Sequence, residues 1–306
     1  MLNVESQAEV RSAPLLPLTA TLGEVVLAVT DRDRALAIWR DVVGLDIVSE
    51  QGARIGLGVD GKVLITLEVT AARPVVKQTI GLYHVAIHVP TRADLAQFAV
   101  RAMQRRVGIA PTDHLVSEAI YAWDTDGNGI EITFETPWRG TLGDADTGSY
   151  GVTTDGKPHS GREPIDMDGL LAELGDNPAL APRMPAGTRI GHVHVHVRDL
   201  DESMRFYRDG LGFGGLFIIR SFGMGDVGLD YMPHTLAFNV WSGGRYAANP
   251  PEDAAGLRWF TIVVPDQATL AAMRRRLATV GARVAEVEGG IETRDPSGNR
   301  MKVVVG

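Results

Sequence analysis

A four-fold internal repeat constrains the fold of this chain more than any other feature. Four segments, each an alternating strand followed by an amphipathic helix, align with one another almost without gaps; they begin at Gly23, Leu82, Gly191 and Leu257. A repeat of this kind indicates that one supersecondary unit has been copied, because each copy needs its neighbours to bury its apolar face. The sequence therefore predicts four copies of one strand–helix–strands module, arranged as two tandem pairs.

Two of the repeats also end alike. Residues 124–131 read DTDGNGIE and residues 295–302 read DPSGNRMK. Asp, Asn, Ser and Gly in this order favour a tight turn, because their side chains hydrogen bond to the local backbone or allow a left-handed conformation. Each segment is therefore predicted to be a turn that leads into the last strand of its module.

Length and composition suit two domains of ordinary size. The chain has 306 residues, 30 basic and 38 acidic side chains and a formal charge of −8, which argues against binding to nucleic acid or to an anionic membrane. Cysteine is absent, so disulfides, thiolate metal ligands and cysteine nucleophiles are excluded. The first twenty residues lack the basic start and apolar centre of a signal peptide, and we therefore expect a cytoplasmic protein.

The same patterns predict the domain boundaries. A stretch rich in Gly, Pro, Asp and Thr separates the two pairs of modules, as expected of a connector. The expected divisions are a disordered tail at 1–20, an N-terminal domain at 21–136 with modules 1 and 2, a connector with one short helix at 137–188, and a C-terminal domain at 189–306 with modules 3 and 4.

The first strand of each module divides its side chains between two faces. In the second module, Val85, Ile87 and Val89 share the face that must pack on the following helix. His84 and His88 lie on the opposite face. A curved sheet with helices on its convex side leaves that opposite face to line a cleft, where small molecules usually bind.

Several strings in these modules resemble a known family. The strings GLYHVAIHVPTRADL, DHLVSEAIY and DTDGNGIEI, followed later by IGHVHVHV and NVW, resemble the vicinal oxygen chelate superfamily of glyoxalases, fosfomycin-resistance enzymes and extradiol dioxygenases. They are most similar to its two-domain, four-module catechol 2,3-dioxygenases. The resemblance implies an α+β fold of four βαβββ modules, paired into two tandem domains with curved mixed sheets and open clefts. It covers nearly all of the chain outside the tail and the connector.

The resemblance also implies a metal site, because ligands in this superfamily lie on the first and last strands of paired modules. Transferred position by position, it assigns Glu24, His84 and Glu131 as metal ligands in the N-terminal half. The fourth position falls on Ile65 or Leu67, which cannot bind a metal. Three protein ligands leave open positions for a substrate that binds through two oxygens.

The identity of the metal follows less directly. Fe(II) is the first expectation, but Glu24 stands where the iron oxygenases have a second histidine. A set of one histidine and two carboxylates is harder and more anionic, so Mn(II) or another divalent ion is the alternative. The resemblance further implies His114 as a catalytic acid/base and Tyr121 as a donor to a developing oxyanion.

The corresponding positions of the C-terminal half contain no carboxylate. Lys302 would repel a cation there, and Trp259 fills the space of a ligand. We therefore expect a degenerate or substrate-binding cleft in this half. A histidine-rich metal or anion site stays open as the alternative, with His192, His194, His234 and Asn239 as its candidates.

The function that these features favour is extradiol ring cleavage of a small aromatic substrate with two neighbouring oxygens, using a divalent metal and O2. The alternatives are a glyoxalase-like lyase or isomerase with a non-redox metal, and a metal-free protein that binds small molecules or confers resistance. No P-loop, GxGxxG, GxSxG or HExxH motif points to another chemistry. Nucleic acid and membranes are not expected partners, and the sequence leaves assembly into a homo-oligomer open.

Overall fold

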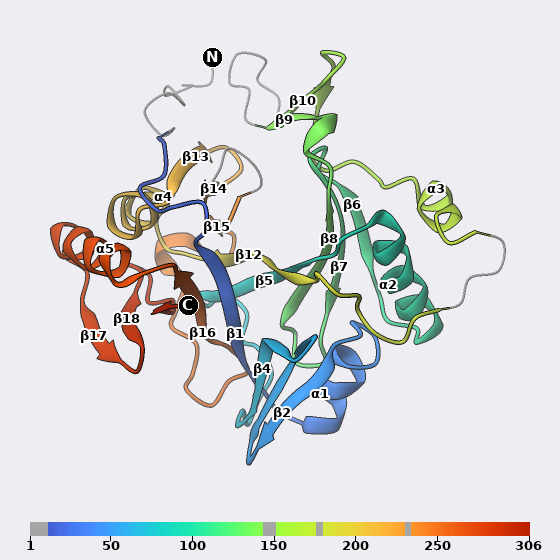
Figure 1. Cartoon of the computed structure of the whole chain (residues 1–306), viewed down its shortest axis with the longest axis horizontal. Helices are drawn as coiled ribbons and strands as arrows, with labels where there is room; N and C mark the ends of the chain where they lie inside the picture. The colour runs from blue at the N-terminus through green and yellow to red at the C-terminus, as the bar shows by residue number, and fades with distance from the viewer. Residues whose placement is uncertain (1–11, 143–150, 176–179, 230–233) are drawn as a thin grey trace.

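Two eight-stranded mixed sheets form the body of the protein (Figure 1). The structure is a computed structural model that describes residues 12–142, 151–175, 180–229 and 234–306. The first sheet, called sheet I below, has the strand order β17-β18-β19-β16-β1-β4-β3-β2. Its strands are β1 (Thr21–Val29), β2 (Asp46–Gln51), β3 (Arg54–Val59), β4 (Lys62–Val69), β16 (Gly256–Val264), β17 (Val284–Val287), β18 (Gly290–Arg294) and β19 (Arg300–Val305).

The second sheet, called sheet II, has the strand order β13-β14-β15-β12-β5-β8-β7-β6. The connector adds a small three-stranded sheet of β9 (Gly140–Leu142), β10 (Gly151–Thr153) and β11 (Pro158–His159). The strands of sheet II are β5 (Gly81–His88), β6 (Ala110–Asp113), β7 (Ser117–Trp123), β8 (Gly129–Glu135), β12 (Arg189–His196), β13 (Gly214–Ile219), β14 (Met224–Gly228) and β15 (Leu236–Asn239).

Each module helix follows the first strand of its module, and a side chain that caps the backbone starts it. The capping residues are Asp31, Thr91, Asp199 and Asp266, each accepting a hydrogen bond from a backbone N–H of the first turn. The helices are α1 (Arg32–Trp39), α2 (Arg92–Gln104), α3 (Met167–Ala172) in the connector, α4 (Leu200–Met204) with its π-helical extension η3 (Arg205–Leu211), and α5 (Gln267–Thr279). Among the described residues, no helix is long and apolar enough to cross a membrane.

The fold class predicted from the sequence is confirmed, but the modules combine in an unexpected way. β1 of module 1 pairs antiparallel with β16 of module 4, and β5 of module 2 pairs antiparallel with β12 of module 3. We expected modules 1 and 2 to form one sheet and modules 3 and 4 the other. The repeat identifies the modules, but it contains no information on which strand edges meet, because that pairing is a contact between residues far apart in the chain.

Within each half of the chain, a buried hydrogen bond joins the helix of the first module to the tight turn of the second. Trp39 Nε1 of module 1 donates a hydrogen bond to Asp124 Oδ2 of module 2, at 3.1 Å. Tyr207 Oη of module 3 donates in the same way to Asp295 Oδ2 of module 4, at 2.7 Å. Burial raises the pKa of Asp124 and of Asp295. The two tight turns thus anchor the helix of the preceding module as well as starting a strand.

Part of the expected tail is ordered. Leu15 and Leu16 donate backbone hydrogen bonds to Gly212 O at 2.8 and 2.9 Å, and Leu16 is buried. The tail that we expected to be disordered as far as residue 20 therefore packs on the end of η3, because its apolar side chain finds a buried site there. Residues 1–11 lie outside the described part of the chain.

The buried contact at Asp295 predicts a loss of stability in Tyr207→Phe. The variant keeps the ring but removes the hydroxyl that donates to a carboxylate which is 4 % exposed, and we expect the free energy of unfolding to fall by about 1–3 kcal/mol. Chemical denaturation followed by circular dichroism measures it. Tyr246→Phe is the control, because Tyr246 is 87 % exposed. Equal stability of the two variants would contradict the prediction.

Candidate metal centre

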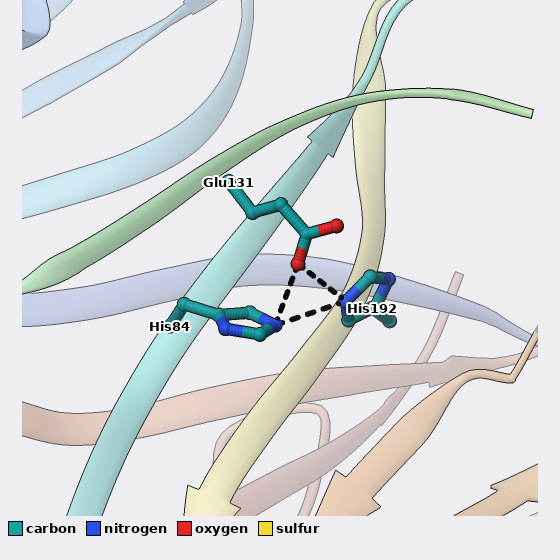
Figure 2. Close-up of side chains that lie close together, drawn as sticks. All are labelled: His84, Glu131 and His192. Carbon is teal, nitrogen blue, oxygen red and sulfur yellow. Dashed lines mark hydrogen bonds and ion pairs between the residues drawn. The ribbon is translucent and has the colours of Figure 1, made fainter. Parts of the chain in front are cut away.

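Two histidines and one glutamate converge in sheet II (Figure 2). His84 comes from β5, Glu131 from β8 and His192 from β12. Glu131 Oε2 lies 2.8 Å from His84 Nε2 and 3.2 Å from His192 Nε2, and the two Nε2 atoms are 3.1 Å apart. All three side chains are buried. The structure therefore places three potential ligand atoms around one point.

The register of three strands explains this convergence. Ala86 of β5 is the register partner of Glu131 in the parallel pair with β8 and of His192 in the antiparallel pair with β12. His84 lies two residues before Ala86 and so points to the same face. Ala86 is thus the register position that relates the three residues, and its own side chain is only a methyl group.

The electrostatics of the three residues suit a cation. Burial alone would raise the pKa of Glu131, but His84 and His192 lower it well below its usual value, so the carboxylate is charged. Thr133 Oγ1 donates to the other carboxylate oxygen at 2.9 Å. Burial lowers the pKa of His192 well below its usual value, which keeps the imidazole neutral. A charged carboxylate beside a neutral imidazole is a protonation state in which such residues bind a metal.

The distances fit a divalent metal as well. An ion about 2.1 Å from each of three ligands at right angles keeps those ligands about 3.0 Å apart. The three separations observed here are 2.8, 3.1 and 3.2 Å. Two imidazole nitrogens that face each other at hydrogen-bond distance would bring their lone pairs together unless a proton or a cation lay between them. The residues present therefore match the donor set of a metal site with two histidines and one carboxylate.

The structure does not bring Glu24 to this cluster. Glu24 lies on β1 of sheet I, where it accepts a hydrogen bond from the Thr66 hydroxyl and lies 3.8 Å from Arg54 Nη2. His192, which we placed among the candidates of the degenerate half, stands beside His84 and Glu131 instead. The assignment of Glu24 failed because it depended on modules 1 and 2 sharing a sheet.

The strand registers relate four positions around the cluster in sheet II to four positions in sheet I. In sheet I these positions cannot bind a cation, because Lys302 Nζ lies 3.8 Å from the centroid of the Trp259 ring and occupies the centre. Arg54 and Arg300 also approach that ring, at 5.4 and 5.3 Å. The four positions are His84, Glu131, His192 and Ala237 in sheet II, and Trp259, Lys302, Glu24 and Thr66 in sheet I.

His194 and Asn239 do not join the cluster. Asn239 Nδ2 donates to His194 Nε2 at 2.8 Å, and His196 Nδ1 donates to Asn239 Oδ1 at 2.7 Å. Asn239 follows His192 by 47 residues, as Glu131 follows His84, and this equal spacing suggested that Asn239 corresponds to Glu131. In the observed register Ala237 takes that position, because it is the partner of His194 as Glu131 is the partner of Ala86.

His114 and Tyr121 lie next to the cluster. Tyr121 stands opposite Glu131 in the pair of β7 with β8, and its ring centroid is 5.3 Å from that of His84. His114 Nδ1 donates to the carbonyl oxygen of Gly161 at 2.6 Å, so His114 Nε2 accepts a hydrogen bond from the Tyr121 hydroxyl at 2.8 Å. Burial lowers the pKa of His114. The connector thus supplies a group, Gly161, that the sequence did not identify.

His234 is a fourth histidine beside the cluster. Its ring centroid lies 4.3 Å from that of His192, and its Nδ1 lies 3.1 Å from Asp226 Oδ2. Burial would lower the pKa of His234, but Asp226 raises it. His234 Nε2 is buried and has no hydrogen-bond partner among the described residues. Sequence patterns did not reveal Asp226, because the Gly-rich sequence from Met224 to Pro233 suggests a loop; the structure has strand β14 at Met224–Gly228, and residues 230–233 lie outside the described part of the chain.

Residues 21–132 and 189–303 match the family described as the Glyoxalase/Bleomycin resistance protein/Dioxygenase superfamily. The chain belongs to this superfamily. It is 34 % identical over 278 residues to the catechol-2,3-dioxygenase of Bacillus subtilis (strain 168), covering 90 % of this chain and 93 % of that protein.

Solved structures agree on the fold. A putative dioxygenase from Bacillus subtilis superposes with a TM-score of 0.64 at 14 % identity, over 93 % of this chain and 84 % of that one. Glyoxalase I from Zea mays superposes with a TM-score of 0.58 at 14 % identity, over 94 % and 92 % of the two chains. At this identity the likeness concerns the fold alone. The dioxygenase and glyoxalase members of the superfamily both imply an enzyme with a divalent metal and a small-molecule substrate.

The geometry predicts opposite outcomes for two alanine variants. His192→Ala removes one of three converging ligands, and we expect the affinity for a divalent metal to fall by more than about a hundredfold. Glu24→Ala should bind metal as the parent does, because Glu24 lies in sheet I. Metal content after purification without chelator, together with a competition titration, tests both. Metal loss in Glu24→Ala, or full retention in His192→Ala, would overturn the ligand set.

Proposed function

We propose that this protein is an extradiol-type dioxygenase that opens the ring of a small aromatic substrate with two adjacent hydroxyl groups. The observation that carries the proposal is the composition of the cluster. Two histidines and one carboxylate, His84, His192 and Glu131, are the ligands of non-haem Fe(II) oxygenases. The set of one histidine and two carboxylates expected from the sequence argued against such chemistry, and Glu24 no longer contributes to it. The similarity to a catechol-2,3-dioxygenase supports the same conclusion.

The metal that we propose for this site is Fe(II), with Mn(II) as the alternative. Bound by the three residues, it would supply a centre that takes two neighbouring oxygens of the substrate and passes electrons between the substrate and O2. The chain leaves room for this, because Ala237 occupies the fourth equivalent position and has no atom that could bind a metal. Burial of the three ligands keeps bulk water away from the reacting groups.

His114 and Tyr121 are positioned to move a proton. A substrate hydroxyl can pass its proton to the Tyr121 oxygen while the Tyr121 hydroxyl passes its own proton to His114 Nε2. The products of this step are a substrate oxyanion and an imidazolium. The lowered pKa of His114 favours return of the proton when the product forms. The carbonyl of Gly161 holds the proton of neutral His114 on Nδ1, which leaves Nε2 as the acceptor.

His234 supplies a second group for proton transfer. Asp226 fixes the ring through Nδ1, so Nε2 is the nitrogen available to a reactant. The ring lies against His192 rather than against Tyr121. We therefore assign separate protons to the two histidines, with His114 acting through Tyr121 and His234 acting directly.

A glyoxalase-like lyase or isomerase is the alternative within the same fold. Its support is the likeness of the fold to glyoxalase I from Zea mays. In that chemistry Glu24 or Glu131 would move a proton, and Glu24 hydrogen bonds to Thr66 in the other sheet. Oxygen consumption separates the two classes, because only the dioxygenase uses O2.

The proposal predicts oxygen-dependent cleavage of a catechol. Fe(II)-loaded protein mixed with a catechol without oxygen should stay colourless, and admission of O2 should give a yellow ring-opened product with one O2 consumed per ring. An oxygen electrode and an absorption spectrum measure the two quantities. Phenol is the matched control, because it lacks the second oxygen and should not react. No oxygen uptake across a panel of catechols, with Fe confirmed in the protein, would shift the assignment to the lyase or isomerase.

The proton-transfer roles predict a specific kinetic defect. Tyr121→Phe and His114→Phe remove the hydroxyl or the accepting nitrogen, and we expect kcat to fall by about 10²–10⁴-fold. Metal content should stay at the level of the parent, because neither residue belongs to the converging set. Steady-state kinetics with metal analysis of the same samples tests this. Parent-like kcat in both variants would assign the proton transfer to other residues, with His234 the next to test.

A further inference from the structure

A row of close polar contacts leads from His192 to the surface of sheet II. His88 Nε2 lies 3.2 Å from His192 Nδ1, the ring nitrogen that faces away from the converging ligands. His88 Nδ1 lies 2.7 Å from Glu135 Oε1, and Arg189 Nη2 donates to Glu135 Oε2 at 3.2 Å. His88 is 1 % exposed, whereas the side chain of Arg189 is 52 % exposed. We call His88, Glu135 and Arg189 the relay.

Each strand that carries a candidate ligand also carries one member of the relay. His88 follows His84 by four residues on β5, and Glu135 follows Glu131 by four residues on β8. Arg189 precedes His192 on β12 and is the register partner of His88. Residues four apart in a strand point to the same face, so the relay lies on the same face of the sheet as the ligands.

The positions of the protons follow from the chemistry of the ligand. His192 can bind a metal through Nε2 only if its proton is on Nδ1, and that N–H then donates to His88 Nε2. The proton of His88 must then lie on Nδ1, the nitrogen that is 2.7 Å from Glu135 Oε1. If His88 Nε2 instead donated to His192 Nδ1, the proton of His192 would lie on Nε2. There it would stand between the other two ligands and exclude a cation.

Glu135 favours the arrangement in which His192 donates to His88 and the proton of His88 faces Glu135. A carboxylate can only accept hydrogen bonds, so it selects the tautomer of His88 that donates from Nδ1. Burial would raise the pKa of Glu135, but the hydrogen bond with His88 and the charge of Arg189 lower it, which keeps the group charged. With its proton on Nδ1, His88 can only accept at Nε2, so His192 has to donate from Nδ1. Glu135 therefore determines the tautomer of His192 through His88.

The backbone of β12 is shaped around the ring of His88. Gly191 is an extra residue in the pairing of β12 with β5, because Ile190 pairs with Ile87 and His192 with Ala86. A Cβ atom at Gly191 would lie 1.9–2.1 Å from three atoms of the His88 ring. Only glycine at this bulge allows His88 to reach His192.

In sheet I the two central strands, β1 and β16, pair with the same bulge but without the relay. Val263 of β16 pairs with Thr21 of β1 as His88 pairs with Arg189, so Val263 takes the place of His88. Gly23 corresponds to Gly191, and its added Cβ would meet Val263 Cγ2 at 3.1 Å. The fold therefore makes this junction with a valine in the sheet that cannot bind a cation. The histidine appears only in the sheet with the converging ligands, which separates its role from that of a packing residue.

We propose that His88 is a positioning residue which, with Glu135 and Arg189, holds His192 in the tautomer that presents Nε2 to a divalent metal. The inference rests on the proposed function in taking His192 as a ligand, and it adds residues beyond the converging set. A metal-ligating histidine usually donates its second N–H to a carboxylate or carbonyl, and loss of such a partner weakens metal binding by about 10–100-fold. Here the carboxylate acts through an intervening histidine.

The test is a Co(II) competition titration on the full chain. His88→Phe keeps the ring volume but removes both nitrogens, and we expect the Kd for Co(II) to rise by about 10–100-fold. His88→Gln should restore binding close to that of the parent, because its amide can accept from His192 and donate to Glu135. His196→Phe is the matched control: it is a histidine of sheet II that follows His192 by four residues and hydrogen bonds to Asn239, outside the relay. Parent-like Kd in His88→Phe would overturn the proposal.

A second measurement reports the tautomer directly. In Zn(II)-loaded protein, ¹⁵N NMR of the histidine rings should show the protons of His88 and His192 on Nδ1, and the His192 signal should lose this preference in His88→Phe. The melting temperature of the metal-free variants checks that the fold is intact. A proton on Nε2 of His192 in the parent would overturn the proposal. Parent protein that binds Co(II) with the predicted ranking but consumes no O2 would refute the dioxygenase function and leave the relay supported.

Discussion

The antiparallel pairing of β5 with β12 is the constraint on which the site depends. Ala86 of β5 is the register partner of His192 and also of Glu131 on β8, so one small residue relates the places of candidate ligands from three strands. A shift of one residue would turn His192 to the opposite face of the sheet. Two bulges set this register, at Gly191 in β12 and at Tyr83 in β5. The bulge at Gly191 also admits the ring of His88, so the same bulge sets the register, the position of His192 and its hydrogen bond with His88.

The sequence predicted what lies within one module and failed where two modules meet. His84 and Glu131 belong to module 2, and their places on its first and last strands follow from the repeat and the family resemblance. The third residue of the cluster comes from whichever module pairs with module 2. Glu24 and His192 occupy equivalent positions in modules 1 and 3, and only the strand pairing decides between them. Contacts from irregular segments, such as that of Gly161 with His114, leave no periodic signal.

The two sheets show what the fold requires and what it does not. Both have the same strand order, the same bulges at their central junction and a helix bonded to a tight turn. Sheet I fills its four central positions with a Lys302–Trp259 contact and a Glu24–Thr66 hydrogen bond, and it forms without buried histidines there. The histidines and the carboxylate of sheet II are therefore not needed to build a sheet of this kind, which is the reason for assigning them to chemistry.

The division of the cluster between the two halves of the chain affects the order of events during synthesis. His84 and Glu131 leave the ribosome before the connector, and His192 follows only after it. The central pairing of sheet II cannot close until β12 has been made. A nascent chain therefore contains at most two of the three candidate ligands until the second half is present, so a metal site built from all three would form only then. Tight ion binding would then require the complete fold. An ion held by the first half alone would exchange readily with the solution.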